Sequence, residues 1–229
     1  MSVSVIIPCA GKSVRFGELK QFKILNDEPL VLKSIKIFAK IKKINEIIIP
    51  VPKSKIDFLS RYIEDKSFKK NIKVIKGGST RQESVEKGME QVNINSNLVC
   101  IHDAARPFVK EALIENCIKE CDYYDGSIVA IKSTDTIKFA KTNTIEKTID
   151  RNNIWLAQTP QVFDKIKLKR AISYSKVDNL KATDESYLME RMGFKINIIE
   201  GSMTNFKITF KSDWPLAEHI EKSFNEYRI

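Results

Sequence analysis

A turn of small residues, followed closely by two cations, offers the first chemistry in this chain. Its members are Ala10, Gly11, Ser13, Arg15 and Lys20, and they follow an apolar run at residues 3–7. A buried strand that ends in small residues lets the backbone approach a ligand, where free N–H groups and basic side chains can hold an anion. Ordinary strand-to-loop turns share this composition, with their basic residues in water. These residues alone leave phosphate binding and a plain turn equally open.

Two later turns carry related residues. The segment 77–81, Gly-Gly-Ser-Thr-Arg, leads into a helical pattern that bears Ser84, and the segment 102–107, His-Asp-Ala-Ala-Arg-Pro, ends another apolar run. Loops at the carboxyl ends of parallel strands meet at one edge of a sheet, and ligands bind there. We therefore expect segments 9–20, 77–84 and 102–107 to converge on one nucleotide pocket.

The elements that position these turns alternate between strand and helix. Strand patterns lie at 3–7, 46–52, 72–75, 98–101 and 127–131, and helical patterns lie at 29–41, 53–65, after 81 and at 111–123. This alternation predicts an α/β fold: a single Rossmann-like domain over residues 1–229, with a mostly parallel twisted sheet and helices on both faces.

The remainder of the chain has less regular spacing. The expected elements are a helix at 164–173, a helix that begins at Thr183, strands at 195–199 and 205–209, and a helix at 213–227. Thr183 fits an N-cap, as does Ser54 for the helix at 53–65. The last helix should bury Leu216, Ile220 and Phe224 on one face. Segment 158–161, Gln-Thr-Pro-Gln, is assigned to no element.

The segment 132–156 breaks the alternation and is expected to form a projecting β-hairpin arm. Strand-prone stretches at 134–139 and 144–149 flank a turn at 141–143. The arm has little apolar surface with which to pack on its own core. Because a projecting hairpin usually finds its partner on another chain, we expect a homodimer; a loose surface loop is the alternative.

Composition narrows the class of protein. The chain has 229 residues, of which 42% are hydrophobic and 30% charged, and a formal net charge of +10. These values are typical of a globular protein, and the apolar runs are too short to span a bilayer. We therefore expect no membrane partner and a cytoplasmic location. The basic residues form no stripe with interleaved aromatic side chains, so no nucleic-acid partner is expected. The four cysteines form no CxxC pair and are expected to be buried free thiols rather than metal ligands.

Together, the turns resemble those of the sugar-phosphate cytidylyltransferases, most closely the 2-C-methyl-D-erythritol 4-phosphate cytidylyltransferase family. The motifs that carry the resemblance are AGxxxRFGxxKQF (10–22), GGxxRxxSVxxG (77–88), HDAARPF (102–108), DTIK (135–138), TIDRNNIWxAQTPQVF (148–163), TDES (183–186) and NFKIT (205–209). They span nearly the whole chain in order. This chain departs from the family at Ser13, where glycine is usual, at Leu19, where proline is usual, and at Ser79, where an acidic residue is frequent.

The resemblance implies cytidylyl transfer from CTP to a polyol phosphate, with release of pyrophosphate. The acceptor phosphate is already an anion at neutral pH, so the reaction needs fixed cations and orientation rather than a general base. The catalytic residues implied by the resemblance are Arg15, Lys20 and Lys207. The implied CTP-binding residues are Ala10, Gly11, Ser13, Gly78, Ser79, Ser84, Asp103 and Ala104. From the local pattern alone, Lys207 is a strand-edge lysine in water and Ser84 a residue of a first helical turn.

The resemblance also implies a site for the acceptor. The polyol-phosphate-binding residues would be Asp103, Thr136, Arg151, Thr159 and Thr183. Thr136 and Arg151 lie on the arm and would reach the neighbouring subunit's site, whereas Asp103 could instead form a salt bridge to Arg106. A Mg²⁺ ion is expected on the triphosphate, held mainly by phosphate oxygens and water, with no dedicated protein metal site.

Two other interpretations compete with this one. A ribitol-5-phosphate cytidylyltransferase, which makes CDP-ribitol, would share the fold and chemistry, but Ala105 and the pair Asp150-Arg151 favour methylerythritol phosphate as the acceptor. A non-catalytic nucleotide- or nucleic-acid-binding module could use the basic surface. The presence of candidate cations in the turns and near the C-terminus argues against such a module.

Overall fold

The computed structural model describes residues 1–11, 13–178 and 180–226, with 224–226 in backbone only. Its main sheet contains β1 (Val3–Ile6), β4 (Ile44–Val51), β5 (Asn71–Lys76), β6 (Leu98–Ile101), β7 (Gly126–Lys132), β10 (Trp155–Asp164) and β11 (Ile196–Glu200). These strands lie in the order β11-β7-β10-β6-β1-β4-β5. Neighbouring strands are parallel except at β10, which runs antiparallel to β6 and β7. The predicted α/β fold with a mostly parallel sheet is confirmed.

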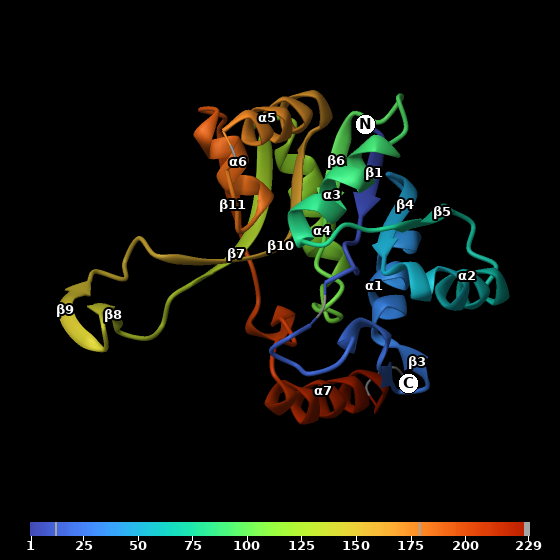
Figure 1. The fold of residues 1–229 in the computed structure, drawn as a ribbon, viewed down its shortest axis with the longest axis horizontal. Helices are drawn as coiled ribbons and strands as arrows, with labels where there is room; N and C mark the ends of the chain where they lie inside the picture. Colours follow the sequence, from blue (N-terminus) through green and yellow to red (C-terminus); the bar gives the residue numbers. More distant parts are fainter. Residues whose placement is uncertain (12, 179, 227–229) are drawn as a thin grey trace.

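Helices cover both faces of this sheet (Figure 1). One face packs against α1 (Leu30–Lys40), α2 (Ile56–Asp65) and α4 (Glu111–Glu120), and the other against α3 (Arg81–Glu90), α5 (Lys165–Val177) and α6 (Glu185–Arg191). Helix α7 (Trp214–Glu226) lies beyond the carboxyl ends of the parallel strands. The short elements are β2 (Ile24–Leu25), β3 (Glu28–Pro29) and the 3-10 turns η1 (Lys20–Phe22), η2 (Lys53–Lys55), η3 (Met203–Asn205) and η4 (Lys211–Asp213).

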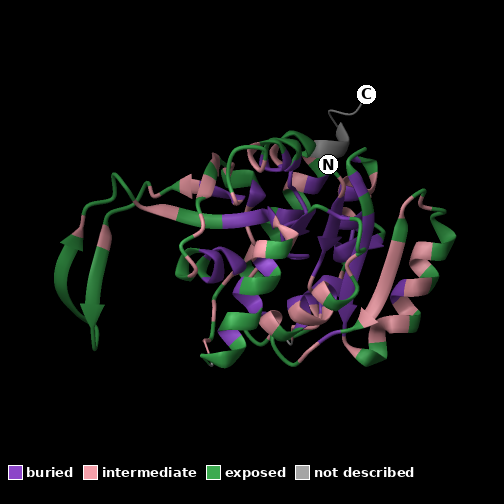
Figure 2. Cartoon of the chain, turned by 90° about the horizontal axis from the view of Figure 1, so that it is seen from above, coloured by how far each residue is buried: buried purple, intermediate pink, exposed green. Residues whose placement is uncertain are grey.

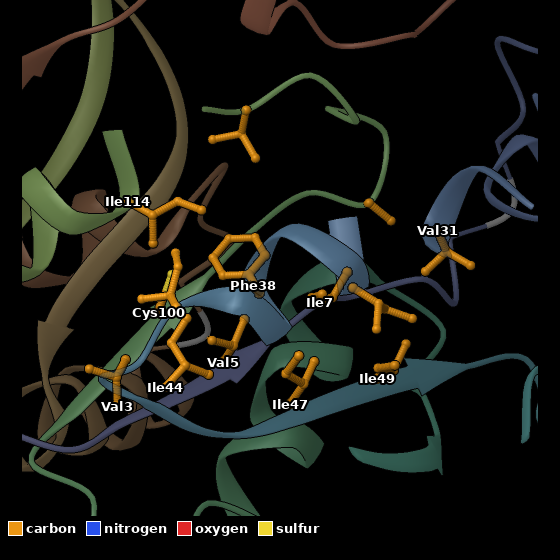
Figure 3. Close-up of a cluster of buried hydrophobic side chains, with 14 of the residues drawn as sticks. Val3, Val5, Ile7, Val31, Phe38, Ile44, Ile47, Ile49, Cys100 and Ile114 are labelled. Atoms are coloured by element: carbon orange, nitrogen blue, oxygen red, sulfur yellow. The ribbon is translucent and has the colours of Figure 1, made fainter. Parts of the chain in front are cut away.

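The central strands are buried on both faces (Figure 2). Side chains alternate across a strand, so in β1 Val3 and Val5 enter the cluster that α1, α2 and α4 cover, while Ile6 enters the opposite cluster. Figure 3 shows the first cluster, with Phe38 of α1 above Val5 and Ile44 of the sheet. The loops that leave these strands therefore start from fixed points.

A third apolar cluster joins the first turn to the C-terminal helix. The ring of Phe16, from the turn, meets the ring of Trp214 in α7 edge-on, with centroids 5.9 Å apart. Phe108 and Ile208 belong to the same cluster. Three segments that are distant in sequence are thus anchored together at the carboxyl edge of the sheet.

The hairpin in segment 132–156 consists of β8 (Ile137–Lys141) and β9 (Thr144–Ile149), and it projects from the body in Figure 1. Its turn residues Thr142 and Asn143 have φ of 45° and 64°, the left-handed values that a two-residue type I′ turn requires. Phe139 and Ile145 are 43% and 61% exposed. An isolated two-stranded hairpin is marginally stable in water, and the arm buries little apolar surface of its own to stabilise it.

In the main sheet, β10 is the strand that was not predicted. Segment 158–161 lies within β10, which pairs with both β6 and β7. The register shifts between Ala157 and Gln161, around Pro160. A proline lacks the N–H that a central strand needs, and it is accommodated there by this irregularity.

Two predicted N-caps are wrong. The N-cap of α2 is Lys55, because Ser54 lies inside η2. The N-cap of α6 is Asp184 rather than Thr183, and its carboxylate accepts the N–H of Tyr187 at 3.1 Å. Asp and Thr both cap helices, so adjacent candidates of this kind are not separated by sequence alone.

The C-terminal assignment also needs correction. Segment 205–209 is not a strand: η3 ends at Asn205, and Lys207 follows in irregular backbone. In α7, Leu216 is 50% exposed whereas Ala217 is buried. The side chain of Phe224 and the predicted helix end at Tyr227 lie outside the described residues.

Candidate active site

The first turn is closed by left-handed backbone at Ser13 and Gly17, with φ of 50° and 86°. The Ser13 carbonyl accepts the N–H groups of Phe16 and Gly17, and its hydroxyl donates to Gln21 Oε1 at 3.0 Å. Glycine reaches this backbone region without steric cost, which accounts for its frequency in the resembling family. Ser13 keeps the turn and adds a side-chain bond. Its departure from the family pattern is thus locally compensated.

Lys20 lies in η1 and is only 7% exposed. Burial, together with the positive charges of Lys207 and Arg15, lowers the pKa of Lys20 to about 8. Arg15 lies at the rim, where its guanidinium stands 5.7 Å from the ring centroid of Phe210. The candidate catalytic cations therefore share one region and repel one another, which favours an anion between them.

Lys207 is held in place by its charge partner and by its backbone. Its ammonium donates to Asp103 Oδ2 at 2.7 Å. The following N–H, of Ile208, donates to the Ala105 carbonyl at 2.9 Å, and the Arg106 guanidinium donates to the Asn205 carbonyl at 2.8 Å. The C-terminal segment is thereby fixed to the turn at 102–107, so Lys207 is not an isolated surface lysine.

Asp103 is surrounded by cations. Arg81 Nε donates to its Oδ1 at 3.0 Å, and Arg106 Nε lies 3.9 Å from its Oδ2. Burial disfavours the carboxylate, but the charges of Arg81 and Lys207 outweigh it and hold the pKa of Asp103 well below its usual range. The proposed Asp103–Arg106 contact exists, yet it is the longest of the ion pairs. Asp103 is therefore ionised and oriented before any ligand arrives.

The backbone of Asp103 is fixed by Thr159 and His102. Burial lowers the pKa of His102 to about 4, so the ring is neutral near pH 7. Its Nε2 lies 3.0 Å from the Arg106 carbonyl, which can only accept; Nε2 therefore carries the proton, and Nδ1 accepts the Thr159 hydroxyl at 3.0 Å. The same hydroxyl accepts the Asp103 N–H at 3.0 Å. Thr159 is 3% exposed, and its hydroxyl bonds serve the turn; contact with the polyol stays a prediction.

A cavity of about 450 Å³ adjoins the glycine turn. Its lining residues are Ala10, Leu19, Pro52, Lys53, Lys76, Gly77, Gly78, Ser79 and Lys87. A Cβ on Gly77 would lie 2.3 Å from the Cβ of Ala10, so glycine is required where the two turns touch. A larger cavity, of about 840 Å³, lies between α1 and segment 107–111. Arg15, Lys20 and Lys207 line neither cavity, but the predicted CTP-binding residues Ala10, Gly78 and Ser79 line the smaller one and none of them lines the larger. The smaller cavity is therefore the better nucleotide site.

The glycine turn is braced by α3. Ser84 is buried, and its Oγ accepts the Gly78 N–H at 3.1 Å and donates to the Thr80 carbonyl at 2.8 Å. Glu83 accepts the N–H of Ser79 at 2.8 Å and its hydroxyl at 2.8 and 2.9 Å. Ser84 is thus a helical residue that shapes the turn and does not line the cavity. Where the family often has an acidic residue, Ser79 instead binds a neighbouring carboxylate.

The other predicted residues lie at different depths. Ala104 is 2% exposed and packs in the core, while Gly11 is partly exposed beside Ala10. Thr183 is exposed at the start of α6. Thr136 and Arg151 are exposed at the base of the arm, where the Arg151 guanidinium donates to the Thr134 carbonyl. The structure does not gather these two with the cations of their own chain.

Two charged residues, the half-buried Arg81 and the buried Glu185, were not predicted as site residues. Arg81 Nη1 donates to Glu185 Oε1 at 2.7 Å while Arg81 Nε binds Asp103. Both residues occur in the GGxxRxxS and TDES motifs, but no spacing in the sequence indicates that they meet. Over residues 1–11, 13–178 and 180–226, no cluster of three or more His, Cys, Asp or Glu side chains could hold a metal ion. No helix within the same ranges is long and apolar enough to cross a bilayer.

A mostly parallel α/β sheet, with fixed cations and a nucleotide-sized cavity at its carboxyl edge, defines a nucleotide-binding protein suited to phosphoryl or nucleotidyl transfer. A model of the 2-C-methyl-D-erythritol 4-phosphate cytidylyltransferase family matches residues 3–223. The chain belongs to this family and is a nucleotidyltransferase enzyme.

Relatives and solved structures agree with this assignment. The 2-C-methyl-D-erythritol 4-phosphate cytidylyltransferase of Dictyoglomus thermophilum is 38% identical, over 94% of each chain. That of Caldicellulosiruptor bescii is 38% identical, over 98% of this chain and 100% of the relative. The crystal structure of 4-diphosphocytidyl-2C-methyl-D-erythritol synthase from Anaerococcus prevotii is 28% identical in sequence and superposes with a TM-score of 0.86. The superposition covers 96% of this chain and 98% of that structure.

Proposed function

We propose that this protein transfers the cytidylyl group of CTP to 2-C-methyl-D-erythritol 4-phosphate, with 4-diphosphocytidyl-2-C-methyl-D-erythritol and pyrophosphate as products. An oxygen of the acceptor phosphate forms a bond to the α-phosphorus, and the bond from that phosphorus to the bridging oxygen of the β-phosphate breaks. The electron pair leaves with pyrophosphate. The observation that carries the proposal is that Arg15 and Lys207 lie close enough to Lys20 to lower its pKa, while Leu19, the residue before Lys20, lines the glycine-turn cavity. This reaction belongs to the methylerythritol route of isoprenoid biosynthesis.

In this proposal the cations do the catalytic work. Lys20 contacts the α-phosphate, Arg15 holds the outer phosphates, and Lys207 stabilises charge that develops at the reacting phosphorus. Asp103, held between Lys207 and Arg81, orients Lys207 and lies where the hydroxyls of the acceptor could bind. The backbone of Ala10, Gly11 and the glycine turn would surround the cytidine.

The acceptor phosphate would be bound by a second subunit. Arg151 and Thr136 lie on the projecting arm, and the guanidinium fork of arginine suits a phosphate. The exposed Phe139 and Ile145 of the arm support a homodimer, since burial against a partner would stabilise the hairpin. Thr159 and Thr183 would position the polyol, Thr159 indirectly through Asp103.

A Mg²⁺ ion would accompany the triphosphate. Asp103 is the carboxylate that meets the site cations, and both of its oxygens are already engaged by Arg81 and Lys207. This fits an ion carried by phosphate oxygens and water, where it would neutralise phosphate charge. We place the reaction in the cytoplasm, which supplies CTP; the four cysteines are free thiols, as expected in a reducing compartment.

The test is pyrophosphate release with CTP, UTP or ATP, each offered methylerythritol phosphate or ribitol 5-phosphate. We expect turnover with CTP and methylerythritol phosphate. Turnover with ribitol phosphate alone would assign the other acceptor, and salt-sensitive binding to nucleic acid without CTP turnover would reject an enzymatic role. Lys207→Ala should lower kcat by ~10²–10³-fold, whereas Lys119→Ala, an exposed change on α4, should leave it unchanged.

A further inference from the structure

Four side chains of alternating charge form a chain of contacts that begins at Lys207. Lys207 Nζ is 2.7 Å from Asp103 Oδ2, Asp103 Oδ1 is 3.0 Å from Arg81 Nε, and Arg81 Nη1 is 2.7 Å from Glu185 Oε1. The line joins the C-terminal segment, the 102–107 turn, α3 and α6. None of these four residues lines the glycine-turn cavity.

Glu185 is costly to bury where it lies. It is 2% exposed, its Oε2 has no hydrogen-bond partner among the described residues, and burial raises its pKa in spite of Arg81. Its neighbours on α6, Leu188 and Met189, are buried and apolar, so an apolar residue would suit the packing as well. A buried ion pair often stabilises a fold less than apolar residues of similar volume. Its bond to Arg81, which in turn binds Asp103, therefore calls for a role other than stability.

The geometry of Arg81 supplies that role. Its planar guanidinium presents Nε to Asp103 and Nη1 to Glu185, so the two carboxylates share one cation from different edges. Asp103 consequently gives only Oδ1 to Arg81 and keeps Oδ2 for Lys207. Without the Glu185 charge, Arg81 would be free to turn both edges of its fork onto Asp103 and compete with Lys207 for Oδ2.

We propose that Glu185 and Arg81 are positioning residues: Glu185 restrains Arg81, Arg81 orients Asp103, and Asp103 aims the Lys207 ammonium at the reacting phosphate. The proposal rests on the cytidylyltransferase function above. It assigns a role to a carboxylate that is two contacts away from the lysine it serves.

The principal variant is Glu185→Gln, which keeps the shape of the side chain and removes its charge. Its matched control is Glu190→Gln, an exposed glutamate on the same helix. We expect Glu185→Gln to lower kcat roughly tenfold, as loss of an outer partner of a functional group does, with KM for CTP nearly unchanged. The control should match the unmodified protein. Circular dichroism and thermal unfolding establish that each variant is folded.

A double-mutant cycle separates positioning from general damage. If Glu185 acts through Lys207, Glu185→Gln should change kcat by less than about twofold in a Lys207→Ala background, yet keep its full effect in a Lys20→Ala background. Equal losses of kcat in both backgrounds would overturn the proposal, because a purely structural defect lowers the kcat of every variant by the same factor. So would an unchanged kcat in the single variant.

Arg81→Lys provides a second test should Glu185→Gln fail to fold. The lysine retains the positive charge but cannot bind two carboxylates from two edges, so we expect a similar loss of kcat. This loss should disappear in a Lys207→Ala background. A wild-type kcat in Arg81→Lys would refute the arrangement. A wild-type protein without CTP-dependent pyrophosphate release would instead reject the proposed function. The two failures are therefore distinguishable.

Discussion

Lys20 should give the enzyme an alkaline limit that lies well below the ordinary pKa of lysine. Its pKa is about 8 in the folded protein, because of burial and of repulsion by Lys207 and Arg15. In the proposed mechanism only the charged ammonium stabilises the α-phosphate, so CTP should be captured less well as this proton is lost. One pH unit above the pKa leaves about one-tenth of the lysine charged. We therefore expect kcat/KM for CTP to fall about tenfold for each pH unit above 9.

The limit should move when CTP binds. In the proposed complex the triphosphate would place negative charge beside Lys20 and raise its pKa, so the alkaline fall of kcat should appear at higher pH than that of kcat/KM. Both are measured by pyrophosphate release between pH 6 and 10. The acceptor phosphate loses its second proton near pH 6, which confines its influence to the acidic limb.

Two variants identify the titrating group. Lys20→Arg stays charged throughout the pH range, so kcat/KM should no longer fall above pH 9. Lys207→Ala removes a repelling charge, so the fall in kcat/KM should move to higher pH while kcat decreases. An unaltered limb near pH 8 in Lys20→Arg would show that another group titrates, and the reasoning from repulsion would be wrong.

Three further outcomes are expected. Arg151→Ala should raise KM for the polyol phosphate with little effect on CTP affinity, and mixed dimers of Arg151→Ala and Lys20→Ala subunits should recover activity if the arm completes the neighbouring site; no recovery would argue against a shared site. Chelation of divalent cations should abolish turnover, and added Mg²⁺ should restore it. Gly88→Ala should lower the free energy of unfolding by about 1–2 kcal/mol in denaturant titrations, because the new Cβ would lie 2.7 Å from Ile6 Cγ2 and overpacking outweighs the gain in helix propensity; the exposed change Glu90→Ala on the same helix should have little effect.

Local pattern was enough to predict the sheet and the convergence of its turns. Apolar runs such as Ile47 to Val51, separated by segments with helical periodicity, predict parallel strands. Parallel strands all end at the same edge of the sheet, so the loops that follow them meet there. Strand β10 was not predicted because Pro160 interrupts the apolar pattern, and proline is normally excluded from central strands. The register shift that admits it is a property of the paired strands and not of the segment.

The charge network was beyond sequence reasoning for a different reason. Arg81 and Glu185 are 104 residues apart, as are Asp103 and Lys207. Nothing in either local segment distinguishes these residues from solvated charges. Resemblance to a family singled out Lys207 and Asp103, but their mutual contact depends on how residues 205–208 are bonded to the 102–107 turn.

The cations of this site oppose folding and favour binding. Lowering the pKa of Lys20 from 10.5 to about 8 corresponds to roughly 3 kcal/mol against the charged form. Because the folded state binds fewer protons than the unfolded chain between pH 8 and 10.5, this term makes stability rise with pH across that window. At neutral pH the folded protein therefore carries the cost of burying this charge and, in smaller part, its repulsion by Lys207 and Arg15. In the proposed complex the triphosphate would offset the repulsion, so Lys20→Met should raise the melting temperature of the unliganded protein while turnover is lost.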